Sequence, residues 1–231
     1  MAVMLLIRVL TSEKQPMKLY YHPLSGYSQK VIVAFYEKGL TFDGSIVELM
    51  DPEAKAAYMK DVYPIGKVPY LVADDAREIP ESSIIIEYLE NNYDSGARLI
   101  PDDKHLARQV RFHDRMSDLY LQNQIGTIFF DSMKPEDQRN PEAVQQARKT
   151  IDTVYGFLEK HLAAGGWMVD KQFSMADCSL VPALNYARMT HPYEGRQNIE
   201  AYWDRLRERP SVKQVMDEAA PYMEAFMKNR G

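Results

Sequence analysis

The strongest constraint on the fold is a change in residue pattern close to position 95. Before it, short apolar and aromatic runs alternate with segments of helical periodicity, and Gly and Pro separate them. After it, only helical periodicity recurs, and no run has the pattern of a strand. Alternating strands and helices form an α/β unit, whereas amphipathic helices alone form a bundle. We therefore predict an α/β unit followed by an all-helical unit.

The first unit begins with a strand, a helix and a second strand. We expect these elements at residues 17–21, 27–38 and 42–49. Ser25 is a good N-cap for the helix, and Gly39 suits the position just after its end. The strand–helix–strand order implies a parallel pair joined by a right-handed crossover.

A second helix, a hairpin and a third helix complete this unit. Asp51 and a proline after it open the second helix. The loop within residues 63–72 leads into a third strand, and a tight turn joins it to a fourth strand at residues 77–79, so we expect the two to be antiparallel. The segment Pro80-Glu81-Ser82 begins the third helix, and we expect its buried side to be formed by Ile84, Ile85, Tyr88 and Leu89.

The remaining chain is predicted to be a helical bundle. We assign residues 1–16 to an N-terminal extension, 17–93 to the α/β domain, 94–102 to a linker and 103–231 to the all-helical domain. An alternative is that Met17 is the natural start. The bundle helices are expected at residues 101–133, 142–164, 174–191, 198–209 and 211–228.

Charge and composition exclude several classes of protein. The net charge of −5 lacks the concentrated basic face of a nucleic-acid binder. The apolar run at the N-terminus is too short to span a bilayer, and Arg8 interrupts it, so we expect no membrane association. A single cysteine, Cys178, forbids an internal disulfide and fits a reducing compartment. We expect a soluble, cytoplasmic protein.

Four segments stand out: Pro-Leu-Ser-Gly-Tyr-Ser-Gln-Lys-Val at 23–31, Ile-Gly-Lys-Val-Pro at 65–69, Glu-Ser at 81–82 and Phe-Ser-Met-Ala-Asp at 173–177. Together they resemble the cytosolic glutathione transferases, and the similarity runs from Met17 almost to the C-terminus. The resemblance implies a thioredoxin-like N-terminal domain and an all-α C-terminal domain. The fourth segment resembles the capping box of the family's sixth helix, with Ser174 as the cap and Asp177 reaching back to it.

The resemblance assigns Ser25 the catalytic role. Its hydroxyl would donate to the sulfur of glutathione at a helix N-terminus, where free N–H groups and the helix dipole favour a thiolate. The alternative reading of Ser25 is a helix cap alone. Tyr20 or Tyr21 could replace it as the donor, because some classes of the family use a tyrosine. With serine at both 25 and 28, dithiol redox chemistry is excluded.

The resemblance also implies how glutathione is held. Pro69 would be cis, and Val68 before it would offer its backbone N–H and C=O to the cysteinyl part. Lys67 could neutralise the glycyl carboxylate, or be an ordinary surface lysine. Glu81 and Ser82 would bind the γ-glutamyl end at a helix N-terminus, although the pair would also suit an ordinary helix start.

The sequence does not identify the second substrate. Tyr27, Tyr120 and Phe129 are candidates for an apolar pocket, together with Met116, Ile128 and Phe130; core packing is the default for such a stripe. Buried Cys178 is expected to be inert, and the five histidines lack zinc spacing, so we expect no metal.

We therefore predict a homodimeric glutathione transferase that attacks an apolar electrophile and uses glutathione as co-substrate. One alternative is a specialised isomerase, dehalogenase or ether-cleaving enzyme with the same glutathione site. The other is a non-catalytic binding module, against which the retained site residues argue.

Overall fold

The computed structural model describes residues 16–228, so the predictions for residues 1–15 lie outside the described residues. Its sheet has the strand order β2-β1-β3-β4. β1 (Lys18–Tyr21) pairs in parallel with β2 (Asp43–Ile46), and β3 (Tyr70–Val72) is antiparallel both to β1 and to β4 (Glu78–Pro80). The predicted parallel pair and hairpin are confirmed. Only four of the eight residues expected in the second strand form it.

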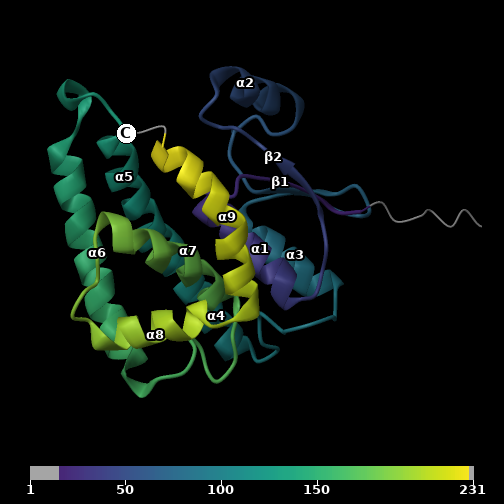
Figure 1. The fold of residues 1–231 in the computed structure, drawn as a ribbon. Coiled ribbons are helices and arrows are strands. Elements are labelled where there is room, and N and C mark those ends of the chain that lie inside the picture. Colours follow the sequence, from purple (N-terminus) through teal and green to yellow (C-terminus); the bar gives the residue numbers. More distant parts are fainter. Residues whose placement is uncertain (1–15, 229–231) are drawn as a thin grey trace, which may run out of the picture.

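Helices cover both faces of this sheet. α1 (Gly26–Glu37) and α3 (Ser82–Asn92) lie on one face, and α2 (Pro52–Asp61) lies on the other (Figure 1). The α1 side continues into the main core, whereas a small cluster of Val47, Tyr58 and Val68 fills the space under α2. This small cluster lies next to the loop that precedes β3.

The predicted buried side of α3 was partly wrong. Ile84 is 53% exposed, whereas Ile85, Ile86 and Leu89 are fully buried. Three consecutive isoleucines fit several helical stripes equally well, and only the packing of α3 against α1 selects among them.

The second part of the chain is all helical among the described residues, as predicted. α4 (Lys104–Met116) continues through a π-helical turn, η1 (Ser117–Gln122), into α5 (Asn123–Ser132). The expected helix over 101–133 is thus one continuous helix with an unforeseen bulge. The other helices are α6 (Pro141–His161), α7 (Met175–Thr190), α8 (Gln197–Arg207) and α9 (Pro210–Lys228), with short 3₁₀ turns at Glu136–Gln138 and Leu162–Ala164.

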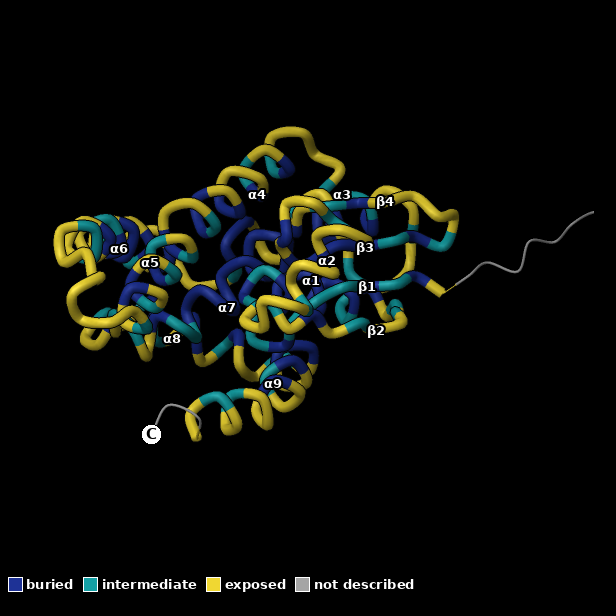
Figure 2. Tube along the Cα trace, turned by 90° about the horizontal axis from the view of Figure 1, so that it is seen from above, coloured by how far each residue is buried: buried dark blue, intermediate teal, exposed yellow. Residues whose placement is uncertain are grey.

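α7 is the central helix of the molecule. Its first ten residues are all buried, and Figure 2 shows it surrounded by the other helices. The predicted cap at its start is present: Asp177 accepts from the backbone N–H and the hydroxyl of Ser174, both at 2.8 Å. The same carboxylate accepts from Met168 N and Tyr202 Oη. One buried acid therefore ties the start of α7 to the preceding loop and to α8.

α9 fastens the helical part to the first domain. Arg209, just before α9, donates to Glu37 of α1 at 2.9 Å, and Tyr36 donates to Glu218 at 2.7 Å. The helix lies across α1 in Figure 1. The Tyr222 ring of α9 lies 6.2 Å from the ring of His22 in the loop that joins β1 to α1.

Candidate functional site

The register of the sheet gathers three of the predicted site segments at one edge. Tyr20 of β1 lies opposite Tyr70 of β3, which in turn lies opposite Pro80 of β4. The chain therefore leaves β1, enters β3 and leaves β4 at the same edge. This places the loop with Ser25, the Val68-Pro69 bond and the Glu81-Ser82 pair next to one another.

Ser25 is the N-cap of α1. Its Oγ accepts from the Ser28 backbone N–H at 3.3 Å, and its own N–H donates to His22 O at 2.9 Å. Among residues 16–228 the Ser25 hydroxyl proton has no acceptor. The hydroxyl is half-buried at a helix N-terminus, where the N–H groups of Gly26 and Tyr27 have no intrahelical partner. A proton donor and two backbone donors thus converge where an anion would be stabilised.

The loop before β3 presents free backbone groups. The Val68-Pro69 peptide bond is cis, as predicted. Tyr58 donates its hydroxyl to Lys67 O at 2.8 Å and fixes the loop from below. Within the described residues, neither backbone group of Val68 has a hydrogen-bond partner. Val68 and Pro69 are buried, whereas the Lys67 side chain is exposed, so an extended peptide can pair with Val68 beside a cation.

The start of α3 is an uncapped helix N-terminus. Glu81 precedes the helix in the left-handed region, with φ +71°, a conformation that costs a non-glycine residue free energy. Its side chain makes no cap bond, and Ser82 is 5% exposed. The first N–H groups of α3 are thus open to an acidic ligand group. The exposed Glu81 carboxylate stands beside them to receive a cationic one.

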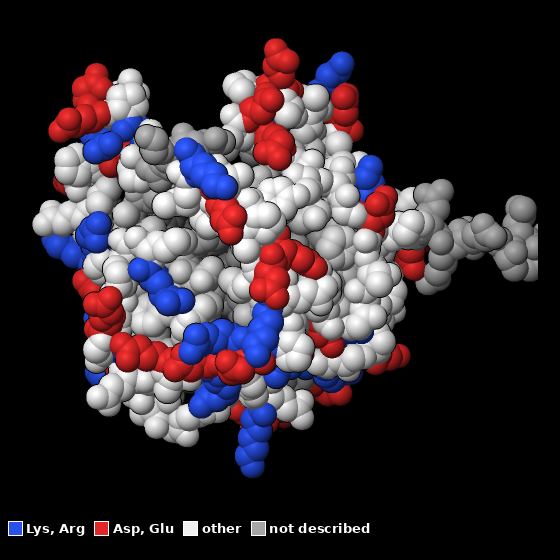
Figure 3. Space-filling view, in the orientation of Figure 1, with Lys and Arg blue, Asp and Glu red and all other residues white. Residues whose placement is uncertain are grey.

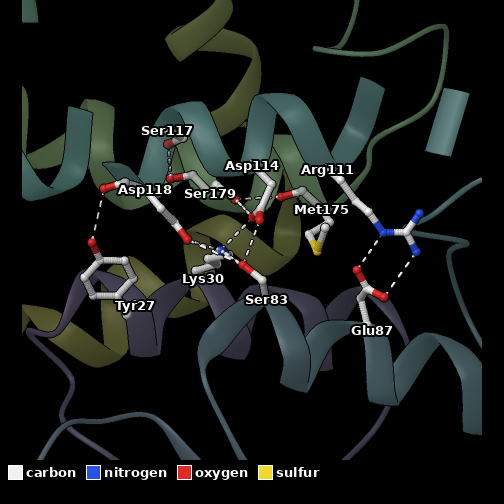
Figure 4. Close-up of polar contacts among 10 residues, drawn as sticks. All are labelled: Tyr27, Lys30, Ser83, Glu87, Arg111, Asp114, Ser117, Asp118, Met175 and Ser179. Carbon is white, nitrogen blue, oxygen red and sulfur yellow. Dashed lines mark hydrogen bonds and ion pairs between the residues drawn. The ribbon is translucent and has the colours of Figure 1, made fainter. Parts of the chain in front are cut away.

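A buried charged network that sequence reasoning missed lies directly behind this helix start (Figure 4). Lys30 of α1 is 1% exposed, and its Nζ lies 2.6 Å from Asp114, 2.7 Å from Asp118 and 2.8 Å from Ser83 Oγ. Ser83 in turn donates to Asp114 at 2.7 Å. Ser179 of α7 also donates to Asp114. The network links α1, α3, α4, η1 and α7, so it joins the two domains beneath the site.

The electrostatics of this network follow from burial and proximity. Burial alone would lower the Lys30 pKa, but Asp118 and Asp114 outweigh it and hold that pKa above its usual value. Burial raises the pKa of Asp118, and Lys30 opposes that rise. A sequence signal existed: Asp114 and Asp118 are four residues apart on one helical face, and Lys30 interrupts the apolar stripe of α1.

Gln122 is a second residue that sequence reasoning missed. Its side-chain amide lies against Gly26, so closely that a Cβ at position 26 would come within 2.6 Å of Nε2. Its Oε1 is buried and has no hydrogen-bond partner in the described part of the chain. A side chain at position 26 would therefore require the Gln122 side chain to move. An amide group therefore stands beside Ser25.

The candidate residues for the second-substrate pocket fall into two groups. Met116 and Ile128 are buried in the main core, so they are packing residues. Tyr120 and Phe130 are more than half exposed. The half-buried Phe129 ring lies 5.8 Å from Phe226 of α9, a residue that sequence reasoning missed.

Tyr27 borders the same region from α1. Its hydroxyl donates to Asn123 Oδ1 at 2.7 Å and to Asp118 O at 3.2 Å. Burial, and then the charge of Asp118, raise its pKa. The ring is half-buried. The hydroxyl is thus engaged with η1 and α5, and only the ring is available to line a pocket.

The remaining candidates lie apart from Ser25 or are inert. Tyr20 packs between Tyr58 and Tyr70 under α2, and Tyr21 packs against Phe42. Cys178 is fully buried, and burial raises its pKa. In the part of the chain that the structure describes, no group of three or more His, Cys, Asp or Glu side chains could hold a metal ion. No described helix is long and apolar enough to cross a membrane.

Fold and site together define a class of protein: a small α/β domain with a candidate site at one edge of its sheet, followed by an all-helical domain. Comparison with known proteins agrees. The family profile described as glutathione S-transferase, N-terminal domain matches residues 19–97, and that described as glutathione S-transferase, C-terminal domain matches residues 121–210. The chain belongs to the glutathione S-transferase family.

Individual relatives support this assignment. The glutathione S-transferase-like protein OpS6 of Beauveria bassiana is 30% identical, over 87% of this chain and 94% of that protein. Protein LigF of Sphingobium is 26% identical, over 88% of this chain and 94% of LigF; its solved structure is described as a β-etherase. A glutathione S-transferase of Methylobacillus flagellatus, solved with glutathione bound, is 27% identical with a TM-score of 0.77, and the match covers 86% of this chain and 98% of that one.

Proposed function

We propose that this protein is a glutathione transferase that holds reduced glutathione across the sheet edge and directs its thiolate at an apolar electrophile. The observation that carries the proposal is the convergence of three segments at that edge. Ser25 at the start of α1 suits a thiol, and the unpaired backbone of Val68 suits a peptide. The open N-terminus of α3 suits an α-amino acid end. The solved Methylobacillus relative has glutathione bound.

Each part of glutathione has a partner in this arrangement. The γ-glutamyl carboxylate binds the N–H groups at Ser82, and the α-ammonium binds Glu81. The cysteinyl backbone pairs with Val68 beside Pro69. Lys67 neutralises the glycyl carboxylate. The chain thus supplies a partner for both carboxylates, the α-ammonium and the cysteinyl backbone of the tripeptide.

Ser25 lowers the thiol pKa by donating to the thiolate. A thiol with a pKa of about 8.5 is only a few per cent ionised at pH 7. A hydrogen bond to a charged acceptor contributes about 1.5–3 kcal/mol. At about 1.36 kcal/mol per pKa unit, this lowers the pKa by about one to two units. The thiolate then becomes a major species at neutral pH. Tyr20 and Tyr21 pack against other aromatic rings, which favours Ser25 as the donor.

The second substrate would lie between the Ser25 loop, η1 and the end of α9. Tyr27, Phe129 and Phe226 supply aromatic surface there, and Gln122 supplies an amide. The attack forms a carbon–sulfur bond while the leaving group departs with its electron pair. Similarity to LigF favours one alternative within this scheme, in which the broken bond is an ether C–O bond and the leaving group is a phenolate.

Calorimetry with glutathione tests the binding half of the proposal. Glu81→Gln removes the partner of the α-ammonium, so we expect the affinity for glutathione to fall by about tenfold, or about 1.4 kcal/mol. The matched control is Glu87→Gln on the same helix, which removes only the partner of Arg111. Equal affinities in the two variants, or no binding to the wild type, would contradict the proposed site.

Activity assays test the reaction half. Conjugation of a chlorinated aromatic electrophile is expected, with loss of chloride. Turnover of a β-aryl ether that releases a fluorescent phenol, without turnover of the chlorinated compound, would instead establish the ether-cleaving alternative. Glutathione binding with neither activity would leave the protein as a binding module.

A further inference from the structure

A tight turn from His22 to Ser25 joins β1 to α1 and presents the Ser25 hydroxyl. The turn closes with a hydrogen bond from the Ser25 N–H to His22 O, 2.9 Å long. Pro23 occupies its second position, where the fixed φ of proline is favoured. The shape of this turn therefore decides where the Ser25 side chain leaves the backbone.

The His22 imidazole makes a second hydrogen bond inside the same turn. The Leu24 N–H donates to His22 Nδ1 at 3.1 Å. Because a backbone N–H can only donate, Nδ1 carries no proton here, and the neutral ring holds its proton on Nε2. Nε2 in turn faces Glu48, 3.5 Å from the nearest carboxylate oxygen. One ring nitrogen thus braces the turn, and the other orients the ring.

Two helices also hold His22 in place. Tyr222 of α9 packs edge-on against the imidazole, with the ring centroids 6.2 Å apart and the planes at 71°. Ser28 of α1 accepts from the His22 backbone N–H at 3.3 Å. The imidazole is only 21% exposed. Its position is therefore set by both domains.

The charge around His22 is supplied locally. Glu48 is its ion-pair partner among the described residues, and the Glu48 side chain is 58% exposed. The face of the molecule that α9 crosses carries charged side chains of both signs, many of them along α8 (Figure 3). Opposite charges offset one another at a distance, so the hydrogen bonds of the ring decide its orientation.

Two further side chains complete the hydrogen bonding of the turn. Gln29 Nε2 donates to Pro23 O at 2.8 Å. The Tyr186 hydroxyl of α7 donates to Leu24 O at 2.9 Å. With the bonds already described, every backbone N–H and C=O of the turn before Ser25 has a partner. The Ser25 hydroxyl proton, in contrast, has no acceptor within the described residues, so a rigid turn presents a free donor.

We propose that His22 is a positioning residue, whose Nδ1 holds the turn in the shape that aims the Ser25 hydroxyl at the glutathione sulfur. This inference rests on the proposed function, since the sulfur is the acceptor that Ser25 meets. Without Nδ1 the Leu24 N–H loses its partner and the turn gains freedom. The Ser25 donor then spends less time in line with the sulfur. The imidazole acts through Ser25 and needs no contact with glutathione.

Two substitutions separate the acceptor from the ring. His22→Phe keeps an aromatic ring against Tyr222 but removes the acceptor. His22→Asn removes the ring but keeps an acceptor, because an asparagine side chain readily accepts from the backbone N–H two residues further on. The proposal requires His22→Asn to restore what His22→Phe loses. If packing of the ring were the important contribution, His22→Phe would be the milder change.

Hydrogen exchange of the Leu24 amide, followed by NMR without glutathione, tests the bond itself. We expect exchange at least about threefold faster in His22→Phe than in the wild type, and a return toward the wild-type rate in His22→Asn. The thiolate absorbance of bound glutathione at neutral pH tests the effect on Ser25. It should fall by at least about twofold in His22→Phe and largely recover in His22→Asn.

Binding of S-hexylglutathione, which has no free thiol, is the control for the rest of the site. Its Kd should change by less than about twofold in either variant. In a wild type that binds glutathione, equal Leu24 exchange, equal thiolate absorbance, or no recovery in His22→Asn would overturn the role of His22 and leave the proposed function standing. A wild type that binds no glutathione would overturn the proposed function and this role together.

Discussion

The Lys30 side chain leaves α1 in the first domain and ends among oxygens supplied by α3, α4 and η1. The ammonium group faces two carboxylates and one hydroxyl within 2.6–2.8 Å; Lys30 and Asp114 are buried, and Asp118 and Ser83 are partly buried. Such a cluster does not stabilise a fold much more than well-packed apolar residues would. Removal of one partner is nevertheless strongly destabilising, because it leaves the remaining charges buried without compensation. Lys30 therefore makes the relative placement of the domains depend on one group.

Lys30→Met tests this at the residue scale. The substitution leaves Asp114 and Asp118 buried without a counter-charge, so we expect the free energy of unfolding to fall by about 3–5 kcal/mol. Adding Asp118→Asn removes one of the stranded charges and should recover part of the loss. Urea denaturation of the single and double variants measures both effects. A double variant less stable than Lys30→Met would show that the ion pairs are not coupled.

His113 gives the fold a defined sensitivity to acid. It is 3% exposed, its ring lies 4.6 Å from that of His161, and its Nδ1 has no partner among the described residues. Burial, and then the charge of His161, lower its pKa from 6.5 to about 4. Below pH 6.5 the unfolded chain therefore takes up a proton that the folded chain refuses until about pH 4. Stability contributed by His113 should fall across that window by about 3 kcal/mol.

His113→Phe should remove the contribution of His113 to the pH dependence of stability, because phenylalanine fills the same buried position and does not titrate. The slope of unfolding free energy against pH between 6.5 and 4 should become shallower than in the wild type, while little changes above pH 7. Denaturant titrations at a series of pH values give the slopes. The same slope in both proteins would mean that other groups account for the acid sensitivity.

At the scale of elements, local signals recover the order of strands and helices but not the details of packing. The N-caps Ser25, Asp51 and Ser174 were predictable because each is a polar residue before an apolar stripe. The π-helical turn η1 was not, since it lies within an otherwise continuous helical pattern. The site followed the same division. The candidate residues in local motifs could be named from the sequence, whereas the Lys30 network, made by contacts between helices, could not.

The segment between the domains contains one glycine, Gly96, at which any side chain would clash with the backbone of α1 and the residue after it. Gly96 has φ +67°, and a Cβ there would lie 2.4 Å from Glu37 O and from the Lys38 Cα. Gly96→Ala should lower the unfolding free energy by at least about 2 kcal/mol. Gly156→Ala is the control, because nothing lies within 4 Å of that position inside α6. The control should gain up to about 1 kcal/mol. Equal thermal shifts in the two variants would contradict the close approach.

At the scale of the whole molecule, the resemblance to the family implies a homodimer. Ile84 of α3 and Phe112 of α4 are about half exposed, and the Glu87–Arg111 ion pair holds these two helices together. We propose that this face is the dimer interface. Sedimentation should give twice the chain mass of 26.7 kDa, and Ile84→Glu should shift the protein toward monomer. Met227→Glu, at an equally exposed position on α9, should not. A wild-type monomer at micromolar concentration would contradict the interface.

The central claim is that two domains combine to hold glutathione as a thiolate beside Ser25. The controls for this claim are Ser25→Thr, which keeps the hydroxyl, and Asp103→Ala, which removes a comparable N-cap from α4. Both should leave the ionisation of bound glutathione unchanged. Any loss of stability in Ser25→Ala should be about 1 kcal/mol, the usual effect of losing a cap.

The most direct measurement is the pH titration of protein-bound glutathione, followed by the ultraviolet absorbance of its thiolate. In the wild type we predict a thiol pKa about one to two units below the free value of about 8.5. In Ser25→Ala most of that shift should disappear. A bound thiol pKa that is the same in Ser25→Ala and the wild type would contradict the account and reduce Ser25 to a helix cap.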